Sequence, residues 1–97
     1  MINVRLTTNR LEVTGHAKRP EGVPPGSNII CAAVSALTLT LAEGLTGIAG
    51  ETVEVRQSDG YISIEWDELS DIGSALISTW FIGILKIQEA YGEIMII

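Results

Sequence analysis

Cysteine and histidine each occur only once in the chain, as Cys31 and His16. A lone cysteine cannot form an internal disulfide, which excludes a disulfide-stabilised scaffold and makes a reducing cytoplasm the expected setting. The chain also lacks the spacing of histidines and carboxylates that is typical of a metal site, and it lacks a glycine-rich phosphate-binding motif. We therefore expect neither a metal ion nor another cofactor.

Basic residues are scarce as well. Six Lys and Arg stand against twelve Asp and Glu, which gives a formal net charge of −6. Because the phosphate backbone repels an acidic chain, we expect no direct binding to nucleic acid, whereas basic segments of other proteins are attracted. The first ten residues contain no apolar signal-peptide region, and the uncharged run at 72–85 is too short to cross a bilayer. We therefore expect no membrane partner.

Apolar residues, by contrast, are abundant. They make up 46% of the 97 residues, while charged residues make up only 19%, below the globular average of about 25%. A chain of this length is expected to form a single domain, which we place at residues 1–97. Such a small domain has little interior for so many apolar side chains, and a homodimer interface is the simplest explanation.

The pattern of apolar and polar residues predicts two strands and then a helix. Residues 2–6 alternate between apolar and polar side chains, and residues 11–15 repeat this period of two. Asn28 is a favourable N-cap, and the sequence from there to about Glu43 predicts a helix. The glycines that follow Glu43 are expected to end it.

The second half predicts the same order again. Strands are expected around 53–55 and 62–66, joined by a tight turn at 58–60, and a helix follows to about Tyr91. Residues 93–97 form a short last strand, either fully buried or at a dimer seam. The order ββαββαβ predicts an α+β domain with a mixed sheet and two packed helices. Three residues are alternative caps for the second helix: Asp67, Ser70 and Asp71.

Cys31 falls in the first turn of the first predicted helix. With Asn28 as N-cap, the cysteine is the third helical residue, where backbone N–H groups have no partner within the helix and the helix dipole places partial positive charge. Both effects favour the thiolate over the thiol, so Cys31 is a candidate nucleophile. The same free N–H groups are expected to hold the oxyanion of a tetrahedral intermediate.

His16 is the candidate partner of this thiolate, as a base or as an imidazolium ion. Ser35 comes one helical turn after Cys31, where its hydroxyl group would orient the thiol or a water molecule. The segment 17–28 contains three prolines and is long for a connection in so small a domain. We expect this segment to cover the substrate. Its candidate contact residues are Gly22, Gly26 and Ser27.

The residues alone leave less specific interpretations open. A cysteine in an apolar helix is most often a small buried side chain, and a lone histidine is most often a surface residue. Ser35 is equally well explained as a tolerated polar residue. A non-catalytic interaction module is therefore the main alternative. A thiol redox protein is disfavoured because no second cysteine completes a Cys-x-x-Cys motif.

One segment of the chain resembles a known family. The sequence VTGHA, followed after a loop by GSNIICAAVSAL, is similar to the signature of the ribosomal-processing cysteine protease (Prp) family. That signature has Gly-His-Ala at a strand end, a flexible loop, and then a hydrophobic pair, Cys, small residues and Ser at a helix start. The element order, the length and the sequence EVRQSDGYISI also fit, so the resemblance covers essentially the whole chain.

The resemblance implies a cysteine endopeptidase with Cys31 as nucleophile, His16 as its partner and 17–28 as a substrate lid. Members remove an N-terminal extension from a large-subunit ribosomal protein in certain bacteria, and related phages process virion proteins instead. The family is homodimeric.

Two features depart from the family pattern. Members usually have Asp at the position of Asn28, and their loop is usually shorter and richer in glycine. The alternative function is an interaction module that keeps the fold and binds a basic ribosomal or capsid protein without cleaving it.

Overall fold

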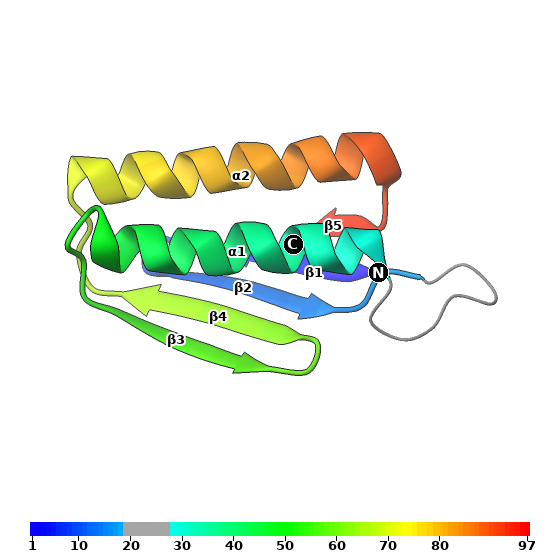
Figure 1. Ribbon diagram of the computed structural model, residues 1–97, viewed down its shortest axis with the longest axis horizontal. Coiled ribbons are helices and arrows are strands. Elements are labelled where there is room, and N and C mark those ends of the chain that lie inside the picture. The colour runs from blue at the N-terminus through cyan, green and yellow to red at the C-terminus, as the bar shows by residue number, and fades with distance from the viewer. Residues whose placement is uncertain (19–27) are drawn as a thin grey trace.

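The computed structural model describes residues 1–18 and 28–97. The first half of the chain contributes β1 (Ile2–Leu6), β2 (Arg10–Gly15) and α1 (Ile29–Gly47). The second half contributes β3 (Val53–Ser58), β4 (Tyr61–Trp66), α2 (Asp71–Tyr91) and β5 (Ile94–Ile96). The predicted α+β class and the order ββαββαβ are confirmed (Figure 1).

The five strands form one sheet in the order β3-β4-β2-β1-β5. All neighbours are antiparallel except β1 and β5, which are parallel, so the sheet is mixed as predicted. Val4, Val13 and Ile62 are paired across three adjacent strands and therefore point to the same face, which both helices cover. The domain thus has two layers, with α1 and α2 side by side on the sheet (Figure 1).

Trp80 of α2 is fully buried at the centre of the core. Its indole N–H donates to the hydroxyl oxygen of Thr38 in α1 (3.1 Å), and Thr38 donates in turn to the carbonyl oxygen of Val34 (2.7 Å). Trp66 is also buried, and its indole N–H donates to the carbonyl oxygen of Thr8 (3.0 Å). Both tryptophans therefore join the core with their polar atoms paired, which avoids the cost of a buried unpaired donor.

The first helix is longer than the sequence predicts. It continues past Glu43, through Gly44, and ends at Gly47. Leu45 is fully buried in this added turn. Its packing offsets the low helix propensity of the two glycines, which costs about 1 kcal/mol each relative to alanine. The helix therefore ends later than the predicted point near Glu43, because core packing overrides local propensity there, but it still ends at one of the glycines expected to stop it.

The last strand lies at the edge of the sheet, where only β1 pairs with it. Ile94 is buried, but Met95 and Ile96 are exposed. The alternative in which the last strand is fully buried is therefore wrong, because the strand pairs along one edge only and two of its three side chains are exposed. Its place at a dimer seam stays a prediction.

The face of the sheet opposite the helices is polar. Arg10 of β2 donates to Glu12 and to the hydroxyl oxygen of Tyr61, both at 2.7 Å, and it forms an ion pair with Glu65 of β4. The hydrogen bond to Glu12 raises the pKa of Arg10 above its ordinary value. This face therefore carries a fixed cation among carboxylates, and it is separate from the helix-covered side that holds the cleft described below.

By length and composition, α1 meets the criteria for a membrane-crossing helix, and no other helix of the described residues does. The core helix of a compact domain passes the same test. Here α1 buries Val34, Leu41 and Leu45 in the hydrophobic core that it shares with the sheet and α2. The absence of a membrane partner stays a prediction.

Candidate active site

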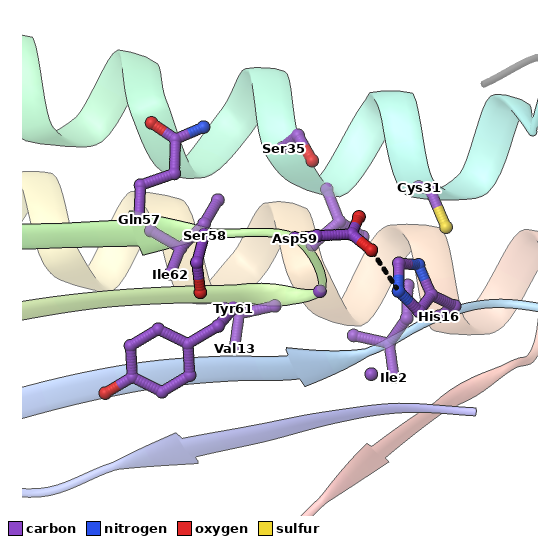
Figure 2. Close-up of a pocket in the computed structure, with 13 residues that line it drawn as sticks. Ile2, Val13, His16, Cys31, Ser35, Gln57, Ser58, Asp59, Tyr61 and Ile62 are labelled. Atoms are coloured by element: carbon purple, nitrogen blue, oxygen red, sulfur yellow. Dashed lines mark ion pairs between the residues drawn. The ribbon is translucent and has the colours of Figure 1, made fainter.

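A cleft of about 510 Å³ opens where the end of β2, the first turns of α1 and the β3–β4 turn meet (Figure 2). Its polar lining contains His16, the residue directly after β2. It also contains Cys31 and Ser35 from α1, and Ser58 and Asp59 at the turn. The two residues that the sequence predicts as a reactive pair thus share one cleft, although fifteen positions separate them.

Cys31 is held in the first turn of α1 by the predicted N-cap. The side-chain oxygen of Asn28 accepts hydrogen bonds from the backbone N–H groups of Ile30 (2.9 Å) and Cys31 (3.2 Å). The first turn contains no acidic residue, so no carboxylate within it offsets the positive end of the helix dipole. Cys31 is half-buried at this end of the helix.

His16 is placed by the strand end before it. Gly15 has φ +92°, and a Cβ atom there would lie 2.5 Å from the carbonyl oxygen of Met1, so the position requires glycine. The carbonyl oxygen of His16 accepts from the α-amino group of Met1 (2.6 Å). The ring itself is exposed over 60% of its surface, and Figure 2 shows it turned toward the sulfur of Cys31.

Asn28 ties the two reactive segments together. Its side-chain amide donates to the carbonyl oxygens of Ala17 (3.2 Å) and Lys18 (3.3 Å), which follow His16 in the chain. The opposite end of the same side chain caps the helix that carries Cys31. A carboxamide can donate and accept at once, whereas a carboxylate only accepts. Asn28 is therefore more than a cap, because one buried side chain spans the gap between strand end and helix start.

The structure corrects the expected oxyanion site. The N–H groups of Ile30 and Cys31 are not free, because both donate to Asn28, and that of Ala32 donates to the carbonyl oxygen of Asn28 (3.0 Å). The N–H group that points at the sulfur belongs instead to Ala17, with its nitrogen 3.3 Å from Sγ. A donor in this position stabilises negative charge on the sulfur.

The other candidate residues divide into two groups. Ser35 lines the cleft one turn after Cys31, as its spacing predicts. Gly22, Gly26 and Ser27 lie outside the described residues, and their contact with substrate stays a prediction. Within residues 1–18 and 28–97, no three His, Cys, Asp or Glu side chains gather in a way that could hold a metal ion.

Two neighbours of the reactive pair are missed by the sequence reasoning: the N–H group of Ala17 and the turn residue Asp59. The sheet register places Thr14 of β2 opposite Tyr61 of β4, so the residues after β2 meet those before β4. The strand end GHA and the turn signal SDG are both visible in the sequence. Neither indicates which strands pair, so their proximity follows only from the sheet order.

The family is decided by a comparison of the whole sequence. The family described as Cysteine protease Prp matches residues 1–96. The chain belongs to this family. The resemblance seen in the sequence is therefore confirmed, and members of the Prp family are cysteine proteases. No curated protein sequence matches the chain.

Solved structures agree with the Prp family fold. One is an essential ribosomal processing protease Prp from S. aureus in complex with a covalently linked product peptide. It is 20% identical, with a TM-score of 0.82 over 98% of this chain and 94% of that one. Another is SMU.848 from Streptococcus mutans, 26% identical, with a TM-score of 0.74 over 98% of this chain and 89% of that one.

Proposed function

We propose that this member of the Prp family is a cysteine endopeptidase with Cys31 as nucleophile and His16 as its proton-transfer partner. One observation carries the proposal: in a chain of a cysteine protease family, the sulfur and the imidazole ring face each other across one open cleft. The helix dipole and the Ala17 N–H group act on the same sulfur, and both favour its ionised form.

The reaction uses the groups around the sulfur. The thiolate of Cys31 attacks the carbonyl carbon of the scissile peptide bond, so a C–S bond forms and charge moves to the oxygen. The C–N bond then breaks, and the leaving amine takes the proton of the His16 imidazolium. Neutral His16 takes a proton from water, the hydroxide attacks the thioester, and the C–S bond breaks. A carboxylic acid leaves, and the thiolate and imidazolium are restored.

The proposed substrate is an extended, basic N-terminal segment of a large-subunit ribosomal protein, with a phage structural protein as the alternative source. The S. aureus relative supports this class, since it is a ribosomal processing protease seen with a substrate peptide. The charge of −6 on this chain favours encounter with a basic segment. The rate constant kcat/KM should therefore fall as ionic strength rises.

We also propose a homodimer in the cytoplasm. An apolar groove of about 360 Å³ lies between the helices, lined by Leu37, Leu41, Leu76 and Trp80. Ile48 at its rim is exposed over 73% of its surface, and burial against a second copy would remove this apolar area from water. Sedimentation at micromolar concentration should show twice the chain mass of 10.4 kDa.

The deciding experiment is incubation with the extended ribosomal protein, and in parallel with phage capsid proteins, followed by mass spectrometry. Cys31→Ala should lower the cleavage rate at least about a thousand-fold while binding persists, because only the nucleophile is removed. Ser35→Ala is the control in the same cleft and should cost far less. If Cys31→Ala cleaves as fast as the parent, the protease assignment is wrong. Binding without cleavage by the parent would support the interaction module.

A further inference from the structure

The imidazole ring of His16 has a second neighbour, the turn between β3 and β4. Nε2 of the ring lies 3.8 Å from a carboxylate oxygen of Asp59, an ion pair when the ring is protonated. Figure 2 shows the ring between the two groups, with one nitrogen directed to Asp59 and the other side toward the sulfur of Cys31. The histidine thus has a distinct partner on each side.

The turn is held against the ring by its backbone. The N–H group of Gly15, directly before His16, donates to the carbonyl oxygen of Gly60 (2.9 Å). Gly60 has φ +67°, and a Cβ atom there would lie 2.6 Å from Nε2 of His16. Glycine at this position therefore serves both the turn and the ring, because any side chain would displace the imidazole. These contacts hold the backbone of the turn, and with it the backbone of Asp59, beside the ring.

We propose that Asp59 is a positioning residue for His16 in the reaction, an inference that rests on the proposed protease function. A carboxylate beside Nε2 favours a proton on that nitrogen and favours the imidazolium form. An imidazolium next to Cys31 in turn favours the thiolate. Asp59 thereby raises the share of molecules that hold the reactive thiolate–imidazolium pair at neutral pH, and it orients the ring for proton transfer to the leaving amine.

The strength of this coupling depends on solvent. Asp59 is 99% exposed and His16 60% exposed, so water screens the pair in the free protein. A peptide in the cleft would displace water from the ring and strengthen the attraction. We therefore expect a small effect on the free thiol and a larger one on cleavage. Two other charged groups near this end of the cleft are the amino group of Met1 and the carboxylate of Glu93, whereas the hydroxyl group of Tyr61 lies on the other face of the sheet beside Arg10.

The test compares Asp59→Asn with Asp67→Asn. The two aspartates flank β4 at opposite ends, so the variants lose the same charge, but only Asp59 faces His16. The readout is the rate at which iodoacetamide alkylates Cys31 from pH 5 to pH 10. Asp59→Asn should lower the rate at pH 7 about three-fold, and the difference should vanish at high pH, where the thiolate forms without the imidazolium. Asp67→Asn should follow the parent curve.

If Asp59 had only a structural role, its replacement would not shift the pH at which the alkylation rate of Cys31 rises. If Asp59→Asn and Asp67→Asn give the same curve as the parent, the proposal is overturned. The cleavage assay separates this outcome from failure of the protease assignment. If Cys31→Ala is inactive and Asp59→Asn cleaves as fast as the parent, the protease assignment stands and only the role of Asp59 is overturned. We expect kcat for Asp59→Asn to fall about ten-fold with little change in KM, because the carboxylate acts through the ring.

Discussion

The two helices of this domain begin with the same kind of cap and use it differently. At α2, the hydroxyl oxygen of Ser70 accepts from the N–H group of Gly73 (3.1 Å). The carboxylate of Glu51 accepts from the N–H group of Ser70 (2.8 Å), and Asp71 adds a negative charge in the first turn. At α1, Asn28 caps the helix, and the first turn contains no acidic residue. One helix end is neutralised by carboxylates, while the other has only the sulfur of Cys31 in its first turn.

The carboxylates at the start of α2 favour stability, whereas their absence at the start of α1 favours reactivity of the cysteine. Carboxylates near a helix N-terminus stabilise the helix by about 0.3–1 kcal/mol each. A helix that begins without them forgoes this gain, and its partial positive charge acts on whatever anion is nearest. At α1 the nearest candidate is the thiolate of Cys31, which the Ala17 N–H group also approaches. The same backbone physics thus stabilises the helix end at α2 and, in the proposed reaction, would stabilise the thiolate of Cys31 at α1.

The largest effect on stability should come from replacing the cap of α1. Asn28→Asp keeps the acceptor for Ile30 and Cys31 but loses the donor to Ala17 and Lys18, and it places a carboxylate against their carbonyl oxygens. We expect a loss of about 1–3 kcal/mol in the free energy of unfolding, together with slower alkylation of Cys31.

The matched control for this exchange is Ser70→Asn at the other helix. Asparagine is a favourable cap, and its amide can donate to Glu51 as the Ser70 hydroxyl group does, so the free energy of unfolding should change by less than about 0.5 kcal/mol. Urea unfolding measures both variants. Equal stability of Asn28→Asp and the parent would show that the bridge to the strand end contributes nothing.

A smaller effect should follow from making the first turns alike. Ile29 is the first residue of α1 and is 65% exposed, while Asp71 holds the same position in α2. Ile29→Asp should slow alkylation of Cys31 at neutral pH about two- to five-fold, because the new carboxylate opposes the thiolate, and salt should reduce the difference.

The reverse change at α2 is its control. Asp71→Asn should lower the free energy of unfolding by about 0.3–1 kcal/mol and leave the alkylation rate unchanged, since α2 has no reactive group at its start. If Ile29→Asp leaves the alkylation rate of Cys31 unaltered at low salt, the dipole of α1 does not act on the sulfur.

The smallest effect concerns pH at the α2 cap. The hydrogen bonds from the side chain and the backbone N–H group of Ser70 hold the pKa of Glu51 below its ordinary value of 4.5. A carboxyl group with a lowered pKa stabilises the fold above its unfolded pKa, and this contribution is lost as pH falls through the folded value. Glu51→Gln should therefore lower Tm at pH 7, and the difference should shrink below pH 4.

The strands, the helices and the candidate reactive residues could be predicted from short stretches of the sequence. Period-two alternation defined the strands, and a cap residue with a helical apolar pattern defined each helix, because these signals act over a few neighbouring residues. Cys31 and Asn28 lie within one helical turn of each other, so their relation was readable from spacing alone. His16 was singled out by composition and by its place at a strand end, and the GHA and IIC motifs led to the Prp family, which the comparison confirmed.

The surroundings of Cys31 and His16, by contrast, follow from the folded arrangement of the strands. The sheet order brings the β3–β4 turn beside the end of β2, so Asp59 meets His16 across 43 positions of sequence. The strand end also places the Ala17 N–H group on the sulfur and its carbonyl oxygen on the side-chain amide of Asn28. These contacts join segments that are distant in the chain. They follow from which strands pair and which face packs, and such choices are made by the whole core rather than by any short stretch.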